Sequence, residues 1–370
     1  MKHPAQIRVL EGLHPFTRSP LHLKKEILML AQLNRTTALQ EDFRMRLARP
    51  ADLVAVTDLL NESAIAQTGA PEFTANELKT FWESPGFDME SGTRVIVSAQ
   101  GEIVAYADLE DTAAIPVTPF LWGRVHPGYE GQGLGTGLLA WGEERAQQAL
   151  ARVPGDVRVA LRTFSLSTHK PTKRLLEKWG MALIRHHWRM VIELDETPPP
   201  PLWPAGISLS TRQERPDLLP IFRATDEAFR DHWGHVDQPE AAAFERFRHW
   251  VDNDEEHDPA SWFLAMDGNE IAAVCLCRPT SHDDPDMAWV NTLGVRRPWR
   301  RQGLALALLH DTFGHFYRDG QKRVGLGVDA SSLTGATQLY EKAGMHVSRQ
   351  YDTYEKELRS GRDLSTQSVE

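Results

Sequence analysis

Residues 295–305 of this chain read Val-Arg-Arg-Pro-Trp-Arg-Arg-Gln-Gly-Leu-Ala, and residues 125–135 carry a similar stretch, Val-His-Pro-Gly-Tyr-Glu-Gly-Gln-Gly-Leu-Gly. The similarity continues downstream, because Leu-Leu-Glu-Lys-Trp-Gly-Met at 175–181 corresponds to Leu-Tyr-Glu-Lys-Ala-Gly-Met at 339–345. Similar segments that recur in the same order indicate an internal repeat. The chain therefore contains a duplicated unit of roughly 155 residues.

Each copy predicts the same order of elements. Residues 94–107 and 262–277 have the pattern of two strands joined by a turn at Gly101 or Gly268. A further strand ends at the valine that opens each repeated stretch, and it runs into a glycine-rich turn and a helix. Strands and helices in this order favour an α+β fold, in which helices flank a central sheet.

A proline-rich segment at residues 197–205 separates the two copies and includes four consecutive prolines. A proline run cannot continue a helix or a sheet, and its extended form makes a semi-rigid spacer. We therefore predict one domain over residues 44–196 and a second over residues 206–360. A partly helical extension (1–43) precedes them, and a polar, loosely held tail (361–370) follows.

The composition is that of a globular chain without a broad basic surface. The formal net charge of the 370 residues is −10, which argues against a nucleic-acid binder. The two cysteines, Cys275 and Cys277, lie in one apolar run and form neither a disulfide framework nor a zinc-binding pattern. No run of about 18 apolar residues occurs, so we expect no membrane span. The predicted location is the cytoplasm.

The glycine-rich stretch before the second-copy helix has the character of a phosphate-binding loop. A helix N-terminus leaves backbone N–H groups unpaired and carries partial positive charge, which favours a pyrophosphate there. Small residues at Gly303 and Ala305 let the backbone approach phosphate oxygens closely. The Gly-Lys-Ser/Thr of a nucleotide P-loop is absent, and Gly131, Gly133 and Gly135 lack the spacing of the dinucleotide fingerprint.

These motifs resemble those of the GNAT superfamily of acetyl-CoA-dependent N-acetyltransferases, and specifically of tandem members such as the mycothiol synthase group. The resemblance rests on residues 295–305 and on Tyr-Glu-Lys-Ala-Gly-Met at 340–345. It covers both copies and leaves out the N-terminal extension. It implies two tandem domains, each a splayed mixed β-sheet flanked by helices, with acetyl-CoA as co-substrate in the wedge of the sheet.

The resemblance also implies which residues hold acetyl-CoA. In the second copy, the main chain of residues 293–295 would pair with the pantetheine arm, and residues 300–305 would wrap the pyrophosphate. The implied cofactor-binding residues of the second copy are Leu293, Gly294, Val295, Arg300, Arg301, Gln302, Gly303, Leu304, Ala305 and Ser332. Those of the first copy are Val125, Gly131, Gln132, Gly133, Leu134, Gly135 and Thr136.

Acetyl transfer to an amine needs a group that protonates the departing thiolate of CoA. Tyr340 suits that role as a general acid, and it stands where the resemblance implies a tyrosine acid. The first copy has Leu176 at that position and Glu130 in place of Arg300. Leucine donates no proton, and a glutamate puts negative charge beside the expected pyrophosphate. We therefore expect a catalytically silent first domain beside a catalytic second domain.

An alkylamine is almost wholly charged at neutral pH, so its proton must also be removed. The mycothiol synthase group offers a glutamate on the strand before the loop, whereas residues 287–292 of this chain contain no carboxylate. Asp329 follows the next expected strand and is a candidate base, although it could equally cap the following helix. Glu227 and Asp231 are further candidates, because the helical segment that carries them usually borders the acceptor site.

His232 and His235 flank Trp233 and Gly234, but no further ligands suggest a metal, and we predict no metal site. We expect these histidines to line the acceptor pocket or to serve the structure. Three aromatic side chains could also line that pocket: Phe229, Trp233 and Trp289.

Together these observations predict an N-acetyltransferase whose second domain transfers acetyl to a primary amine of a small acceptor. The attack is direct, in a ternary complex, and the acidic chain favours cationic acceptors. Two alternatives stay open. One is a non-catalytic, regulatory acetyl-CoA-binding protein, against which the intact Tyr340 and Arg300 argue. The other is an acetyltransferase that modifies proteins or peptides, which would require an open groove.

Overall fold

The structure of the chain is a computed structural model, and it describes residue 39 and residues 41–368. The helix expected in the N-terminal extension lies outside the described residues. The strands are β1 (Phe43–Arg46), β2 (Thr93–Ser98), β3 (Ile103–Glu110), β4 (Phe120–Val125), β5 (Val159–Leu166), β6 (Ala182–Glu193), β7 (Ile207–Thr211), β8 (Trp262–Asp267), β9 (Glu270–Arg278), β10 (Met287–Val295), β11 (Arg323–Asp329) and β12 (His346–Arg359).

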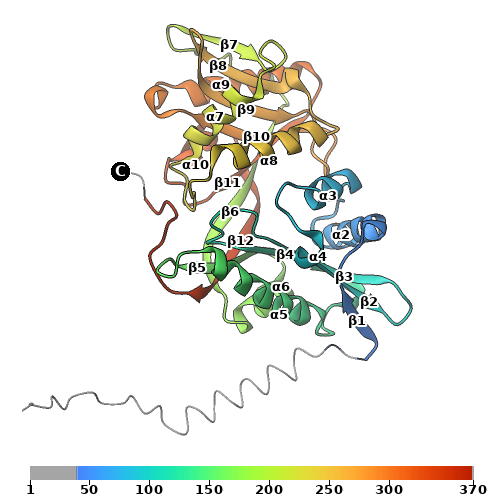
Figure 1. The fold of residues 1–370 in the computed structure, drawn as a ribbon. Helices are drawn as coiled ribbons and strands as arrows, with labels where there is room; N and C mark the ends of the chain where they lie inside the picture. Colours follow the sequence, from blue (N-terminus) through green and yellow to red (C-terminus); the bar gives the residue numbers. More distant parts are fainter. Residues whose placement is uncertain (1–38, 40, 369–370) are drawn as a thin grey trace, which may run out of the picture.

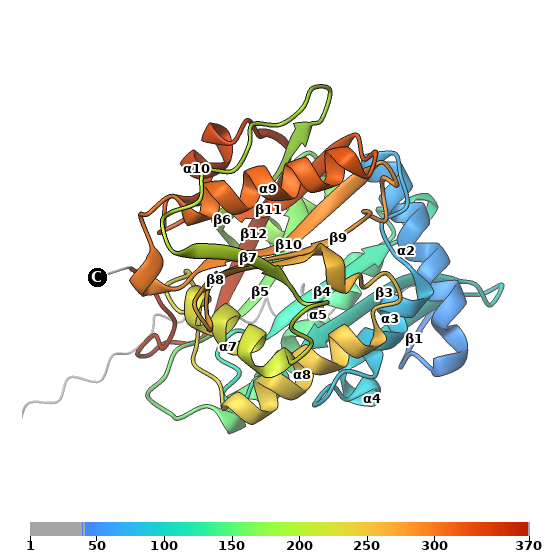
Figure 2. The ribbon, with the colours of Figure 1, turned by 90° about the horizontal axis from the view of Figure 1, so that it is seen from above.

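The α-helices are α2 (Leu53–Thr68), α3 (Ala75–Trp82), α4 (Met89–Gly92), α5 (Leu134–Gln147), α6 (Lys170–Lys178), α7 (Leu218–Phe229), α8 (Glu240–Asn253), α9 (Leu304–Arg318) and α10 (Ala336–Lys342). Short 3₁₀ helices are η1 (Pro50–Asp52), η2 (Pro127–Tyr129), η3 (Gln148–Arg152), η4 (Pro259–Ser261) and η5 (Arg297–Trp299). Helices lie on both faces of the sheet; in the second half, α9 covers one face and α7 and α8 the other (Figure 2).

All twelve strands form one continuous sheet in the order β1-β2-β3-β4-β5-β12-β6-β11-β10-β9-β8-β7. Figure 1 shows two lobes, one from each copy, with β6 and β12 running between them. The expected α+β fold of two tandem units is confirmed. The repeat is visible in the hairpins β2–β3 and β8–β9, and in the helices α5 and α9 that follow the two glycine-rich turns.

The two copies exchange their last strands. Strand β6, which ends the first copy, pairs antiparallel with β11 along the whole length of β11. Strand β12, which ends the second copy, pairs antiparallel with β5 of the first copy and with β6. Each half-sheet is therefore completed by a strand from the other half, and the sequence did not predict this exchange.

In both halves the sheet opens at the place where the glycine-rich turn begins. Strands β10 and β11 are parallel and paired from Met287 to Val290, so the pairing stops before the end of β10. The corresponding strands β4 and β5 pair only between Phe120 and Arg162. A β-bulge between Val290 and Thr292 further interrupts the pairing of β10 with β9. The last residues of β10 are therefore not paired with β11.

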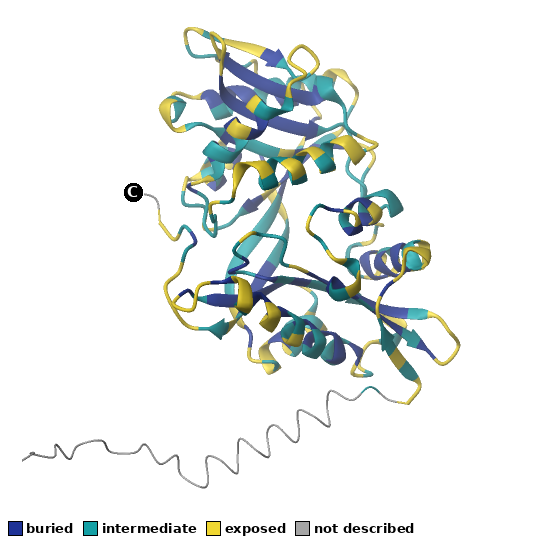
Figure 3. Cartoon of the chain, viewed as in Figure 1, coloured by how far each residue is buried: buried dark blue, intermediate teal, exposed yellow. Residues whose placement is uncertain are grey.

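Apolar side chains fix the helices that follow the turns against the sheet. In α9, Leu309, Phe313 and Phe316 recur at helical spacing and are buried beneath β8 and β9. In α5, Leu138 and Leu139 are buried in the same way against β3 and β4. The central strands and these helix faces form the buried layer of each lobe (Figure 3). This packing holds the start of each helix at the open end of the sheet.

The C-terminal tail is not loose where the structure describes it, and this expectation was wrong. The N–H of Gly234 donates to the carbonyl of Thr366 (2.8 Å), and the N–H of Thr366 donates to the carbonyl of His235 (2.9 Å). Trp233 Nε1 donates to Gln367 Oε1 at 2.9 Å. Backbone groups form such bonds whatever the side chains are, so a polar composition did not reveal the contact.

Among the helices of the described residues, none combines the length and the apolar character that crossing a membrane requires.

Candidate active site

A cleft of about 400 Å³ lies where β10 and β11 separate, and we call it the second-half cleft. Its lining includes eight of the ten cofactor-binding residues expected in the second copy: Leu293, Gly294, Val295, Arg300, Arg301, Gly303, Leu304 and Ala305. The others are turned to structural contacts. Gln302 Nε2 donates to the carbonyl of Pro298, and Ser332 Oγ accepts from the N–H groups of Thr334 and Ala336 at the start of α10.

The turn before α9 is shaped for a phosphate. Gly303 has φ of +89°, and no atom lies within 4 Å of the place that a Cβ would occupy. Arg301 is also left-handed, with φ of +60°, which is uncommon for a residue with a side chain. Helix α9 begins at Leu304, so its first N–H groups have no acceptor in a preceding turn. These groups and the partial positive charge of the helix end fit a pyrophosphate.

The side chain of Arg300 holds the loop in shape. Its Nε donates to the carbonyl of Val295 (3.0 Å) and its Nη2 to the carbonyl of Ala228 (3.1 Å). Its Nη1 donates to Asp231, which also accepts from Arg297. Hydrogen bonds from Arg297 and Arg300 hold the pKa of Asp231 well below its usual range, so this buried carboxylate stays charged. Asp231 is therefore a structural anion and a poor base.

Tyr340 projects from α10 into the lining of the second-half cleft, and only 7% of the residue is exposed. Burial raises the pKa of its phenol, with the neighbouring Cys275 adding to the effect. The hydroxyl is thus protonated at neutral pH. A protonated hydroxyl in this cleft has the state that a proton donor requires.

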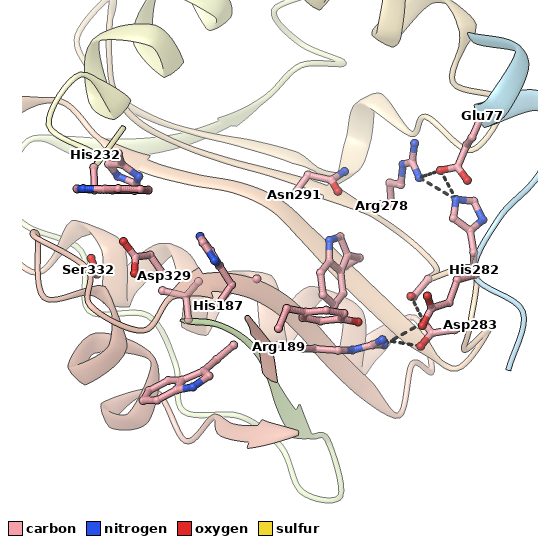
Figure 4. A pocket seen from close by; sticks show the side chains of 18 of the residues that line it. Glu77, His187, Arg189, His232, Arg278, His282, Asp283, Asn291, Asp329 and Ser332 are labelled. Carbon is pink, nitrogen blue, oxygen red and sulfur yellow. Dashed lines mark hydrogen bonds and ion pairs between the residues drawn. The ribbon is translucent and has the colours of Figure 1, made fainter. Parts of the chain in front are cut away.

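A second cavity of about 570 Å³ adjoins this cleft and lies between the two halves; we call it the interdomain pocket. The two cavities share three lining residues, His232, Leu333 and Thr334. Figure 4 shows His232, Asp329 and Ser332 at one end, Glu77, Arg278, His282 and Asp283 at the other, and Asn291 and His187 between them. The expected lining residues Trp233 and Trp289 do line it, whereas Phe229 packs at a tilt against His232, with ring centres 4.2 Å apart.

Ion pairs between the halves close the far end of the interdomain pocket. Glu77 of α3 accepts hydrogen bonds from Arg278 Nη1 at 3.0 Å and from His282 Nε2 at 2.6 Å. Burial alone would raise the pKa of Glu77, but the bonds from His282 and Arg278 outweigh it and lower that pKa. The bond to Glu77 raises the pKa of His282. Nearby, Arg189 on the exchanged strand β6 pairs with Asp283.

Of the expected bases, Asp329 lies in the interdomain pocket and Glu227 does not. Asp329 Oδ2 accepts from Arg185 Nε, and its Oδ1 accepts from the N–H of Ser331, each at 2.9 Å. Glu227 pairs with Arg296 Nε at 2.7 Å, and neither cavity lining includes it within the described part of the chain.

Two histidines in the pocket were not expected to act as bases. His232 lines both cavities, and burial, helped by Arg300, lowers its pKa, with Asp329 and Asp231 opposing. Burial also lowers the pKa of His187, whose Nδ1 lies 3.1 Å from Thr353 Oγ1. Both imidazoles therefore favour the neutral form near pH 7. His187 lies on β6, and only the strand exchange brings it to the pocket.

The first half has a cleft of its own, of about 480 Å³, in the corresponding place. Six of its seven expected cofactor-binding residues line it, Gln132 being the exception: Val125, Gly131, Gly133, Leu134, Gly135 and Thr136. Leu176 occupies the position of Tyr340 there, and Glu130 Oε1 lies 3.2 Å from His169 Nε2. We call this cavity the first-half cleft.

Comparison with known proteins places the chain in a family. The model of the acetyltransferase (GNAT) family matches residues 218–345. A crystal structure of a GCN5-related N-acetyltransferase from Sphaerobacter thermophilus superimposes with a TM-score of 0.70 and 37% identity, over 88% of this chain and 99% of that one. This chain belongs to the GCN5-related N-acetyltransferases.

Other GCN5-related N-acetyltransferases show the same tandem arrangement and a related sequence. A tandem GNAT protein from the clavulanic acid biosynthesis pathway has a TM-score of 0.63 at 15% identity, over 86% of this chain and all of that one, and so shares the fold. A mycothiol acetyltransferase from Thermobispora bispora is 28% identical over 306 residues, which is 80% of this chain and 92% of that protein. One from Saccharopolyspora erythraea is 27% identical over 252 residues, 67% of this chain and 80% of that protein.

The expected similarity to the mycothiol synthase group is thus confirmed. As a GCN5-related N-acetyltransferase, this protein is an acyltransferase that uses acetyl-CoA as co-substrate. The second-half cleft fits that co-substrate on the features already described, namely an open glycine turn, a free helix end and the separated edge of β10.

Proposed function

We propose that the second half holds acetyl-CoA in the second-half cleft and transfers its acetyl group directly to a primary amine bound in the interdomain pocket. The observation that carries this proposal is that the two cavities meet at shared residues, His232, Leu333 and Thr334. A thioester held in the cleft and an amine held in the pocket would meet there, so both reactants are positioned without a covalent enzyme intermediate.

The main-chain groups of residues 293–295 and the start of α9 would hold the co-substrate. Acetyl-CoA supplies the acetyl group as an activated thioester. Tyr340 then protonates the departing thiolate, because its buried hydroxyl is protonated and lines the same cleft. Cys275 and Cys277 are buried in β9 with their sulfurs 3.6 Å apart, and neither lines the cleft or the pocket among the described residues, which argues against a thiol nucleophile.

His232 is our first candidate for the base that takes the proton from the ammonium. It lies where the cavities meet, and its pKa lies below the usual value, so the ring is neutral and able to accept a proton. Asp329 ranks second, because each of its carboxylate oxygens already accepts a hydrogen bond and is less able to take a proton. Glu227 comes last, because Arg296 holds its carboxylate.

We propose a small-molecule acceptor, for which two observations speak. Both halves wall the interdomain pocket, which gives it the character of a ligand cavity more than that of an open groove for a protein chain. The relatives named mycothiol acetyltransferase support the same class of acceptor. A purely regulatory binding protein is disfavoured by the acid and the base candidate that face the joined cavities.

The decisive experiment measures CoA thiol release in the presence of amines. We expect release to depend on an amine and kcat to fall about 10²-fold in Tyr340→Phe, because the thiolate loses its proton donor. Tyr317→Phe is the matched control, since Tyr317 lies on α9 outside both cavity linings. Unchanged kcat in Tyr340→Phe would remove this tyrosine from the mechanism, and failure to bind acetyl-CoA would overturn the proposal as a whole.

A further inference from the structure

The interdomain pocket opens into a third cavity, of about 750 Å³, that we call the aromatic chamber. Four residues line both: Glu72, Glu77, His187 and Tyr351. The seven aromatic side chains of the chamber come from both halves of the molecule: Phe73, Phe81, Phe120, Trp122, Phe164, Trp250 and Tyr351. The chamber is therefore continuous with the pocket in which we place the reacting amine.

The chamber walls are ordered by contacts among the aromatic rings. The ring centres of Phe73 and Trp122 lie 5.3 Å apart, and Phe164 lies 5.9 Å from Phe120 and 5.8 Å from Tyr351. Trp250 reaches the chamber from α8 of the second half and is 37% exposed. Two hydrogen bonds between α8 and α3 of the first half hold this wall in place: His249 Nε2 donates to the Thr80 carbonyl and Asn76 Nδ2 to the Asn253 carbonyl, each at 2.8 Å.

Both glutamates that the chamber shares with the interdomain pocket are paired with basic side chains. Glu72 pairs with Arg349 at 2.7 Å, and Glu77 is held by Arg278 and His282. Arg124 is the exception: its guanidinium lies over the ring of Trp122 at 4.8 Å and its Nη1 donates to the Gly123 carbonyl at 3.1 Å, but its buried Nε has no hydrogen-bond partner among the described residues. Burial raises the pKa of Asp108 well above its usual value, which favours the neutral acid. What the chamber offers a ligand is therefore mainly aromatic surface.

The position of the chamber indicates which ligand it holds. The first-half cleft, which shares Trp122 and Phe164 with the chamber, carries Leu176 at the position of the acid Tyr340. The chamber also shares lining residues with the interdomain pocket and with a cavity of about 490 Å³ that includes Phe120 and Thr353. Continuity with the interdomain pocket assigns the chamber to the same ligand as the amine, as the place where the rest of the acceptor lies.

We propose that the acceptor is an elongated amphiphilic amine, whose amino group lies in the interdomain pocket and whose apolar, aromatic or long aliphatic body occupies the aromatic chamber. The proposal rests on the proposed function, because it names the class of substrate for that site. It predicts that apolar length beyond the amine raises affinity, since burying that length against aromatic walls removes apolar surface from water.

The test compares n-butylamine with 4-phenylbutylamine, which have the same reacting group. In the wild-type protein we expect kcat/KM for CoA thiol release to be about tenfold higher for the aryl amine. We expect that ratio to fall toward one in Trp250→Ala and in Phe164→Leu. Trp141→Ala is the control, since Trp141 is a half-buried tryptophan of α5 that lines none of the cavities described above, and it should leave the ratio unchanged.

Equilibrium binding separates this proposal from the proposed function. Calorimetry with the two amines should show about tenfold tighter binding of 4-phenylbutylamine, lost in Trp250→Ala, whether or not thiol is released. Equal affinities for the two amines in the wild-type protein would overturn the chamber proposal. A preference that persists in both chamber variants would also overturn it. Absence of thiol release with the binding preference intact would count against the proposed function alone.

Discussion

Asp231 and Arg300 form an ion pair that joins the end of α7 to the turn before α9. Arg300 of the glycine-rich stretch thus pairs with a carboxylate about 70 residues earlier in the chain, just after the end of α7. The backbone of the loop is left to face the cleft. The same carboxylate precedes His232 directly, so the pair fixes the loop turn and the candidate base together.

Replacing Asp231 by Asn removes the carboxylate that Arg297 and Arg300 both contact. We expect Asp231→Asn to lower the free energy of unfolding by about 2 kcal/mol at pH 7, measured by urea titration. The pKa of Asp231 is depressed in the folded state, so its contribution is present above the unfolded value of about 3.9 and is lost as the pH falls through the folded value. The difference in free energy of unfolding between the wild-type protein and Asp231→Asn should therefore become smaller in strong acid.

The control for that variant is Asp226→Asn. It removes the solvent-accessible ion pair between Asp226 of α7 and Arg230, the residue that follows α7. We expect it to change stability by less than about 0.5 kcal/mol. Equal stability of Asp231→Asn and wild type at pH 7 would contradict the structural role of this pair.

The two clefts can be counted by calorimetry with acetyl-CoA. Gly133 and Gly303 both have φ near +85°, and both leave the Cβ position open, so Glu at either puts a charged side chain toward the phosphate site. We expect two sites in the wild-type protein, with the weaker one in the first half because Glu130 lies in that cleft. Gly303→Glu should remove the tighter site and all thiol release, and Gly133→Glu only the weaker site.

A single site in the wild-type protein would mean that the first-half cleft does not hold the co-substrate. Retention of the tighter site in Gly303→Glu would show that the turn before α9 is not the phosphate site.

The role of His232 is tested by the pH dependence of kcat/KM. If a neutral His232 takes the proton of the bound ammonium, activity should fall only below a pKa that is lower than the usual 6.5 or so of histidine. In His232→Gln we expect about 10²-fold lower kcat/KM at pH 7, with a rise that continues toward the pKa of the amine near 10. His235→Gln is the comparison, because His235 lies three residues away and outside both cavity linings in the described structure. If the fall of kcat/KM at low pH is unchanged in His232→Gln, His232 is not the base, and Asp329 becomes the first candidate.

Glu77 links the halves, and its removal should weaken the whole molecule. The raised pKa of His282 means that its contribution is complete below about 6.5 and declines as the pH rises through the folded value. The lowered pKa of Glu77 means that its contribution is present above about 4.5. We expect Glu77→Gln to lower the free energy of unfolding by about 2 kcal/mol at pH 6 and by about 1 kcal/mol at pH 9. The loss is smaller at pH 9 because, of the two donors to Glu77, only Arg278 is still charged there.

The matched variant is Glu83→Gln, at the exposed end of α3, which should change the free energy of unfolding by less than about 0.5 kcal/mol at either pH. A loss in Glu77→Gln that is equal at the two pH values would exclude His282 from the link.

Much of the fold is encoded in local patterns that can be read along the chain. The repeated glycine stretches predict a turn and a helix because glycine, which has no Cβ, readily adopts the left-handed conformation of Gly133 and Gly303. Apolar spacing also marks the buried face of α9. The same patterns place Tyr340 beside the cleft, since the helix that carries it is part of the repeat. These features depend on neighbours in sequence, and so they were predictable.

Sequence by itself therefore determined the duplicated unit, the glycine-rich turn before each helix and the candidate acid Tyr340. The exchange of β6 and β12, and with it the arrival of His187 in the interdomain pocket, was decided only by the tertiary structure, because either partner strand offers the same backbone hydrogen bonds. The tertiary structure likewise decided that Arg300 pairs with Asp231 and that Arg296 pairs with Glu227, since an ion pair depends on distance in space. The aromatic chamber has the same origin, because residues from both halves line it.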